Sequence, residues 1–147
     1  MFEIKRYTSD SQRAWNEYVA KARNATFLFM REYMDYHSDR FCDHSLMFFK
    51  DGKLYALLPA HVSGDVLCSH LGLTYGGLIM NMNVTIVETC ELFAELNDYL
   101  RSIGIHKVVY RPVPWIYHVH PSEEDLYAIF WKCGARLSLR NIGTTII

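Results

Sequence analysis

The sequence has little that would place the protein in a membrane, on nucleic acid or outside the cell. No apolar run approaches the ~20 residues that a membrane-spanning helix needs. The 15 basic and 16 acidic side chains are interspersed and give a net charge of −1, so we expect neither nucleic acid nor a membrane surface as a partner. The first residues lack the apolar stretch of a signal peptide, which predicts a cytoplasmic protein.

The cysteines also lack the spacing of a metal site or a disulfide framework. Cys42, Cys68, Cys90 and Cys133 stand far apart and form no CxxC pair. In a chain without a secretory signal, such cysteines are predicted to be reduced and buried. Cys90 and Cys133 fall on the apolar faces of predicted helices, which favours the same interpretation.

Length and composition predict one globular domain over residues 1–147. Half of the residues are apolar and 14% are aromatic, which favours a packed core over disorder. A chain of this size buries roughly 70% of its unfolded surface. Because the final residues, Gly143-Thr-Thr-Ile-Ile147, end on apolar side chains, we expect the sequence to be a piece of a longer chain.

The first part of the chain predicts two helices and a hairpin. Apolar side chains recur at helical spacing after Ser9 and Asp10, and a second short helix is predicted over residues 30–37. Asp51-Gly52 separates two apolar runs and predicts a hairpin, because a type I′ turn needs positive φ at both central positions. The two strands of that hairpin are expected at 45–50 and 54–58, before Pro59.

The second part predicts strands and helices in alternation. An extended segment over 66–80 precedes a helix over 86–103, in which Thr85 and Glu88 have the spacing of a capping box and Gly104 ends the helix. A buried strand follows at 106–110.

A last helix begins after Pro121 and Ser122, and Gly134 ends it. Its inner face is expected to consist of Leu126, Ile129, Phe130 and Cys133. Residues 135–147 have a strand-like pattern, with Arg136 and Arg140 on the polar face.

The stretch from Ser69 to Leu78 is the most informative part of the sequence. Gly72, Gly76 and Gly77 interrupt what would otherwise be an apolar strand. Glycine inside a strand marks a bulge or the close approach of a ligand or another backbone, since it packs nothing and costs entropy on folding. We expect this segment to spread neighbouring strands and open a crevice. A purely structural bulge is the alternative.

Several stretches of the sequence carry a resemblance to a known family. They are Ala25-Thr-Phe-Leu-Phe29, Leu57-Leu-Pro-Ala60, Ser69-His-Leu-Gly-Leu-Thr-Tyr-Gly-Gly77, Pro114-Trp-Ile-Tyr-His118 and Pro121-Ser-Glu-Glu-Asp-Leu-Tyr127. The order of predicted elements resembles the Gcn5-related N-acetyltransferase (GNAT) fold. The sequence itself resembles the first half of FemAB-like acyltransferases, which contain two such domains in tandem. The resemblance covers nearly the whole chain, and its motifs are moderately specific.

This resemblance implies a fold and a reaction. The fold class would be α/β (α+β): a mixed, mostly antiparallel sheet with a β-hairpin, a bulged central strand and helices on both faces. The reaction would transfer an acyl or aminoacyl group from a thioester or ester donor to an amine. The implied partners are a small-molecule, cell-wall or sugar amine acceptor and a second GNAT-like domain in the same chain.

The resemblance also implies acetyl-CoA or another acyl donor for the full-length protein. Acetyltransferases of this fold usually hold the coenzyme A pyrophosphate with a glycine-containing loop before a helix, where backbone N–H groups can bind phosphate. Here the helix follows Asn81-Met-Asn-Val-Thr85, which has neither glycine nor arginine. We therefore expect this half to bind no donor and to help shape the acceptor cleft, or else to be a non-catalytic binding or scaffolding domain.

The candidate site residues surround the glycine-rich stretch. The expected substrate-binding residues are Ser69, Gly72, Tyr75, Gly76, Gly77, Arg111, Tyr117 and His118. Tyr75 and His70 are the candidates for a catalytic role, although a tyrosine beside glycines also fills the space they leave. Arg111 either meets an anionic substrate group or is solvated.

Other chemistries have less support in the sequence. Ser69 and His70 are adjacent and would face opposite sides of a strand, so they cannot form a nucleophile–base pair by themselves. His118 and His120 would share a strand face, but a third metal ligand is missing nearby. We therefore predict no metal site.

Overall fold

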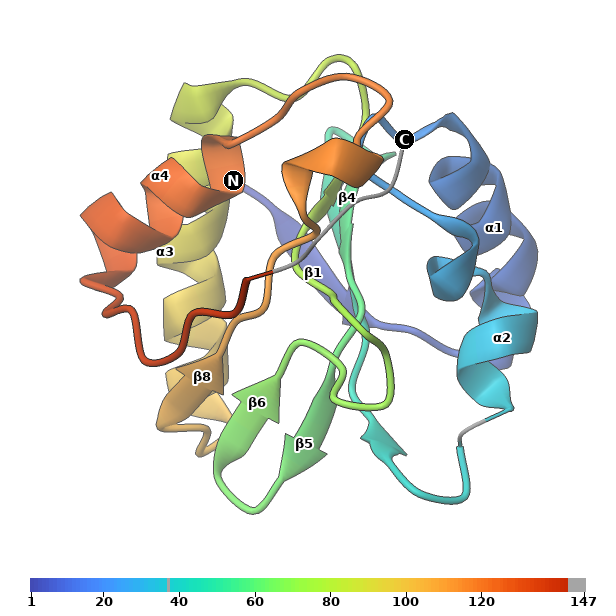
Figure 1. Cartoon of the computed structure of the whole chain (residues 1–147), viewed down its shortest axis with the longest axis horizontal. Coiled ribbons are helices and arrows are strands. Elements are labelled where there is room, and N and C mark those ends of the chain that lie inside the picture. The colour runs from blue at the N-terminus through green and yellow to red at the C-terminus, as the bar shows by residue number, and fades with distance from the viewer. Residues whose placement is uncertain (37, 143–147) are drawn as a thin grey trace.

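A bent β-sheet lies between two pairs of helices in the computed structural model, which describes residues 1–36 and 38–142 (Figure 1). The strands are β1 (Glu3–Arg6), β2 (Cys42–Asp43), β3 (Leu46–Lys50), β4 (Lys53–Leu58), β5 (His61–Ser63), β6 (Val66–Cys68), β7 (Ile79–Met80) and β8 (Lys107–Val109). The helices are α1 (Gln12–Lys21), α2 (Arg31–Asp35), α3 (Ile86–Ser102) and α4 (Glu124–Cys133), with 3-10 turns η1 (Ser9–Ser11), η2 (Phe27–Phe29) and η3 (Trp115–Tyr117).

The sheet has two halves that continue into each other. One half has the strand order β1-β3-β4-β7 and the other β2-β5-β6-β8. Pro59 and Ala60 join β4 to β5, and the His44 N–H donates to the Ala60 carbonyl (2.9 Å) at the bend. Neighbouring strands are antiparallel except β6 and β8, which are parallel. The predicted mixed, mostly antiparallel sheet is therefore confirmed.

The β3–β4 hairpin confirms the turn predicted from sequence. Asp51 and Gly52 have φ values of 50° and 75°, the two positive values that a type I′ turn requires. Because β4 ends at Leu58, Pro59 stands just outside the ladder, where its missing N–H costs nothing.

Side chains of the central strands alternate between two cores, one on each face of the sheet. Leu46, Phe48 and Leu58 pack on the side of α3, while Met47 and Leu57 pack on the side of α1 and α2. This alternation follows from the two-residue period of a strand. It confirms the expectation of helices on both faces (Figure 1).

Helix α3 follows its sequence signals closely. The Thr85 side chain accepts a hydrogen bond from the Glu88 N–H, and Gly104 follows the helix with a φ of 78°. Four apolar side chains at helical spacing on α3 are buried, namely Cys90, Phe93, Leu96 and Leu100. Ile86 and Ile103, at the two ends, are partly exposed.

The predicted inner face of the last helix is wrong for three of its four residues. In α4 the buried residues are Asp125 and Ala128, and Ile129 is half-buried. Leu126, Phe130 and Cys133 are exposed. Apolar side chains occupy more than one side of this helix, so hydrophobic periodicity alone cannot predict which side is buried. The buried positions are taken instead by the small Ala128 and by Asp125, which accepts a hydrogen bond from Tyr110.

Three further expectations need correction. Residues 135–142 form no strand, and residues 143–147 lie outside the described residues. All four cysteines are free as predicted, but Cys42 and Cys133 are exposed. Residues 69–78 are not part of a strand, and they are described next.

Candidate functional site

Residues 69–78 form a long excursion from the sheet. Cys68 pairs with His61 and Ile79 pairs with Leu57, so residues 69–78 stand opposite only residues 58–60 of the neighbouring strand. The predicted continuous segment over 66–80 is therefore wrong, while the predicted interruption at the glycines is correct. The excess chain leaves the ladder as a loop.

The two ends of this loop meet at the backbone of Arg111, in the segment after β8. The Ser69 Oγ accepts a hydrogen bond from the Arg111 N–H (2.6 Å), and the Gly76 N–H donates to the Arg111 carbonyl (2.9 Å). A Cβ atom at Gly76 would lie 2.8 Å from the Ser69 carbonyl oxygen. Gly76 is therefore required because two backbones touch where the loop closes. We call Ser69, Gly76 and Arg111 the neck.

A buried phenol joins the loop to α4. The Tyr110 Oη accepts a hydrogen bond from the Leu78 N–H (2.6 Å) and donates to the Asp125 Oδ2 (2.5 Å). Gly77 has a φ of 86°, and a Cβ there would come within 3.0 Å of the Tyr110 Oη. Burial raises the pKa of Asp125, and burial together with the neighbouring carboxylate raises the pKa of Tyr110. These contacts tie the residue before β7 to the residue after β8 and to α4.

One side of the loop packs against an aromatic cluster of Phe41, His61 and His70. The Phe41 ring centroid lies 4.9 Å from that of His61 and 5.4 Å from that of His70. The Leu71 N–H donates to the His61 Nδ1 (3.2 Å), and burial lowers the pKa of His61. A Cβ at Gly72 would lie 2.6 Å from the Phe41 ring. Gly72 and the buried His70 are thus part of a packed contact.

The other side of the loop presents a pair of tyrosines. The Tyr75 ring stacks on the Tyr117 ring, with centroids 5.3 Å apart and an interplanar angle of 27°. The Tyr75 hydroxyl donates to the Thr26 Oγ1 (3.1 Å), and Tyr117 is half exposed. These rings lie near the surface, where a bound molecule can reach them. The catalytic role of Tyr75 stays a prediction.

Arg111 and His118 have different surroundings. The Arg111 side chain is half-buried, and within the described part of the chain it has neither a hydrogen bond nor an ion pair. Both ring nitrogens of His118 contact backbone atoms, Nε2 at the Val113 carbonyl (3.0 Å) and Nδ1 at the Ser122 N–H (3.2 Å). His118 follows η3 and does not lie on a strand, so the predicted shared strand face with His120 is wrong. Among residues 1–36 and 38–142, no group of His, Cys, Asp or Glu has a metal-binding arrangement.

The structure therefore brings together some of the predicted residues and separates others. Ser69, Gly76 and Arg111 meet at the neck, and Tyr75 meets Tyr117. Sequence reasoning missed Tyr110 and Asp125, which close the gap beside Gly77. The strand before Tyr110 was predicted to be buried, but Lys107 and Val108 of β8 are exposed. The available signal was a tyrosine directly after a strand, since a buried tyrosine usually finds a hydrogen-bond partner.

The first turn of α3 contains a carboxylate that the chain's own side chains bind. The Glu88 carboxylate accepts hydrogen bonds from the Lys50 Nζ (2.5 Å) and the Tyr55 Oη (2.7 Å), and also from the Thr85 Oγ1 (3.2 Å). These bonds, the one from Lys50 first, lower the pKa of Glu88. A negative charge in the first turn compensates the helix dipole.

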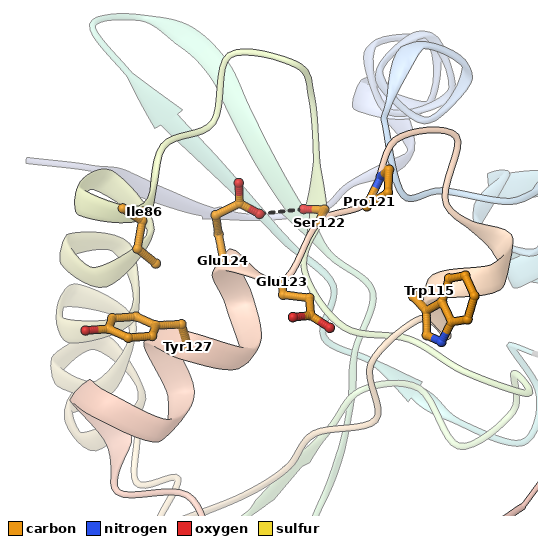
Figure 2. A pocket seen from close by; sticks show the side chains of 7 residues that line it. All are labelled: Ile86, Trp115, Pro121, Ser122, Glu123, Glu124 and Tyr127. Carbon is orange, nitrogen blue, oxygen red and sulfur yellow. Dashed lines mark hydrogen bonds between the residues drawn. The ribbon is translucent and has the colours of Figure 1, made fainter.

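A shallow pocket of about 680 Å³ lies beside this helix start (Figure 2). Its lining comes from α3, η3 and the start of α4: Ile86, Trp115, Pro121, Ser122, Glu123, Glu124 and Tyr127. Glu124 accepts from the Ser122 Oγ (2.7 Å) and pairs with Arg23 (3.0 Å). Figure 2 shows the Glu123 carboxylate between Tyr127 and Trp115. A second cavity of about 370 Å³ lies where α3 and α4 meet β8, and neither cavity is lined by residues 69–78.

The surroundings of the α3 N terminus do not fit coenzyme A. A pyrophosphate needs unoccupied backbone N–H groups and a positive local charge. Here Thr85 caps the Glu88 N–H, the Glu88 carboxylate stands in the first turn, and Glu123 and Glu124 line the adjoining pocket. The loop before the helix is also closed locally, because the Asn83 N–H donates to the Asn81 side chain (2.8 Å).

Comparison with known proteins identifies the fold. No family model matches the sequence, and no curated protein matches it. Among solved structures, the chain is similar to the ribosomal-protein-S18-alanine N-acetyltransferase from Escherichia coli, with a TM-score of 0.51 and 14% identity over 74% of this chain and 64% of that one. The chain thus spans less than two thirds of that enzyme. The fold is therefore GNAT-like.

Two other solved structures are similar. A transcriptional regulator from Bacillus halodurans matches with a TM-score of 0.52 and 8% identity over 99% of this chain and 100% of that chain. The PaiA N-acetyltransferase from Thermoplasma acidophilum, solved in complex with coenzyme A, matches with a TM-score of 0.43 and 13% identity over 71% of this chain and 75% of that one. The last likeness is too low to support an argument. No helix in the described residues is long and apolar enough to span a bilayer.

Proposed function

We propose that this chain is the acceptor-binding GNAT-like domain of a FemAB-like acyltransferase, and that it does not itself bind the coenzyme A donor. The observation that carries the proposal is the α3 N terminus, where the Glu88 carboxylate puts a negative charge in the first turn and the Thr85 side chain already accepts from the Glu88 N–H. In the full-length protein, a second GNAT-like domain would then supply the acyl or aminoacyl donor.

The loop over residues 69–78 supports the acceptor role. The neck holds Arg111 by its backbone, which leaves its guanidinium unbonded among the described residues and available to an anionic group of an acceptor. Tyr75 belongs to the same loop and Tyr117 to η3, and their stacked rings lie close to the surface. A cation at the neck and aromatic rings on the same loop would together suit a polar acceptor such as an amino sugar or a cell-wall peptide.

The chemistry expected of such a domain is positioning. An acceptor held by Arg111 and the tyrosine pair would present its amine to a donor on the other domain, and fixing that orientation lowers the entropic part of the barrier. We assign no residue of this chain as a general base.

A thermal-shift titration tests the proposal. A ligand at 100 times its Kd stabilises a protein by about 2.7 kcal/mol. We expect no shift with millimolar acetyl-CoA and a saturable shift with a cell-wall precursor or an amino sugar. Arg111→Gln should abolish that shift, whereas Lys107→Gln, with the same loss of charge at an exposed position of β8, should preserve it.

Two results would contradict the proposal in different ways. Saturable binding of acetyl-CoA, reversed by free coenzyme A, would show that this chain holds the donor. Failure of every amine acceptor to bind would leave a scaffolding domain, the function that the acidic first turn of α3 also permits.

A further inference from the structure

Helix α4 presents an exposed apolar face. Tyr127, Phe130 and Trp131 are spaced three and four residues apart and therefore lie on one side of the helix. Their exposed fractions are 53%, 69% and 65%, while Asp125, on the opposite side of the helix, is buried. We call these three residues, together with Leu126 and Ile86 beside them, the α4 face.

The area of the α4 face matches that of the largest apolar patch on a typical monomer. An aromatic side chain has roughly 150–250 Å² of surface, so the three exposed rings leave about 400 Å² uncovered, and Leu126 and Ile86 bring the total to roughly 550 Å². The largest apolar patch of a typical monomer spans about 300–600 Å² and is often an interaction site. Two such faces together would bury roughly 1,100 Å², which exceeds the ~1,000 Å² expected of a biological interface.

Charges flank the α4 face in an asymmetric way. Glu123 and Glu124 stand at the start of the helix, and Lys132 and Arg136 stand at and beyond its end. Glu123, Lys132 and Arg136 are exposed, and within the described residues none of the three has an ion pair. When two copies of this helix lie antiparallel, the acidic start of each meets the basic end of the other. Antiparallel helices also bring opposite dipole ends together.

From this complementarity we propose that the α4 face is a two-fold interface with a second copy of this chain. In such an isologous interface the same patch contacts itself, so aromatic rings fill the centre and unlike charges surround them. The acidic helix start makes an anionic membrane an unsuitable alternative, because its phosphates would be repelled. The proposal is independent of acyl transfer and of acceptor binding at the neck.

Sedimentation equilibrium between about 5 and 200 μM is the first test. We expect a monomer–dimer equilibrium in the wild type and monomers in Phe130→Glu at every concentration. Phe27→Glu is the matched control, because Phe27 is 68% exposed on η2, away from α4, and should still dimerise. A wild type that stays monomeric at 200 μM, or a control that dissociates equally, would overturn the proposal.

A charge exchange tests the antiparallel arrangement. Glu123→Lys and Arg136→Glu should each raise the dissociation constant at least threefold. The double variant should regain most of the affinity. In the antiparallel arrangement residue 123 of each copy faces residue 136 of the other, so exchanging both charges restores two unlike pairs per dimer. Additive weakening in the double variant would contradict this geometry.

Cross-linking tests the position of the axis without relying on affinity. In a Cys42→Ser, Cys133→Ser background, Phe130→Cys near the middle of the helix should form an intermolecular disulfide on mild oxidation. Val119→Cys, equally exposed but distant along the chain, should not. Equal yields from the two positions would show random collision.

Discussion

Replacing Tyr110 by phenylalanine tests the contact that closes the gap beside the glycine-rich loop. The change removes one oxygen and leaves two buried partners without a hydrogen bond, the Leu78 N–H and the Asp125 carboxyl group. Each unsatisfied buried group costs about 1–3 kcal/mol, so we expect a loss of about 2–6 kcal/mol in the free energy of unfolding. That is a large part of the 5–15 kcal/mol typical of a domain.

Urea denaturation followed by circular dichroism measures this loss, and Asp125→Asn provides the matched control. An asparagine oxygen can still accept the hydrogen bond from the Tyr110 hydroxyl, while the cost of burying a charge is removed. Asp125→Asn should therefore be as stable as the wild type at pH 7, or more so. Amide hydrogen exchange should accelerate at Leu78 in Tyr110→Phe and remain slow in Asp125→Asn.

The pH dependence of the same variants provides a second measurement. The pKa of Asp125 is raised in the folded state, so its contribution to stability is fully present below the pKa of the unfolded chain and is lost as pH rises through the folded pKa. Asp125→Asn should remove this decrease between weakly acidic and neutral pH. If Tyr110→Phe lies within 0.5 kcal/mol of the wild type, or if Asp125→Asn destabilises as much as Tyr110→Phe, the reasoning is refuted.

Three further predictions follow from the described contacts. Gly76→Ala should destabilise by about 1–3 kcal/mol in urea, because its Cβ would lie 2.8 Å from the Ser69 carbonyl oxygen. Wild-type stability of this variant would show that the neck opens freely. Phe130→Ser should change the free energy of unfolding by less than about 0.5 kcal/mol at concentrations below the dimerisation range, because Phe130 is exposed. Leu96→Ala should cost about 2–5 kcal/mol, because Leu96 is buried. A larger loss from Phe130→Ser would mean that Phe130 is buried, as the sequence predicted. The pKa of Glu88 is lowered in the folded state, so its stabilising effect should be lost as pH falls through that pKa. If Glu88→Gln showed the same dependence of stability on acidic pH as the wild type, this prediction would be wrong.

Elements that depend on neighbouring residues could be predicted from the sequence. The β3–β4 turn needs two positive φ values, and Asp51-Gly52 provides them within two residues. The start of α3 depends on Thr85 and Glu88, three residues apart. In both places the residues that determine the backbone are those that form it, so a local pattern was sufficient.

The buried face of α4 depended instead on a distant partner. Asp125 lies inside because the Tyr110 hydroxyl donates to it, and Phe130 lies outside although it is the more apolar residue. Hydrophobic periodicity cannot predict this choice, because it assigns charged residues to the surface. The wrong buried face of α4 and the absence of Tyr110 from the predicted site thus have one cause, the hydrogen bond from the Tyr110 hydroxyl to Asp125.

The glycine-rich loop combines both situations. Its glycines showed where the chain leaves the ladder, but their reason lies in the backbone of Arg111, far along the sequence. Gly76 is explained by contact with Ser69, and Gly77 by the Tyr110 phenol, so neither glycine needs a ligand to account for it. The side chains of Arg111, Tyr75 and Tyr117 are not explained by the closure of the loop. The case for acceptor binding therefore depends on these three side chains and not on the glycines that first drew attention to the segment.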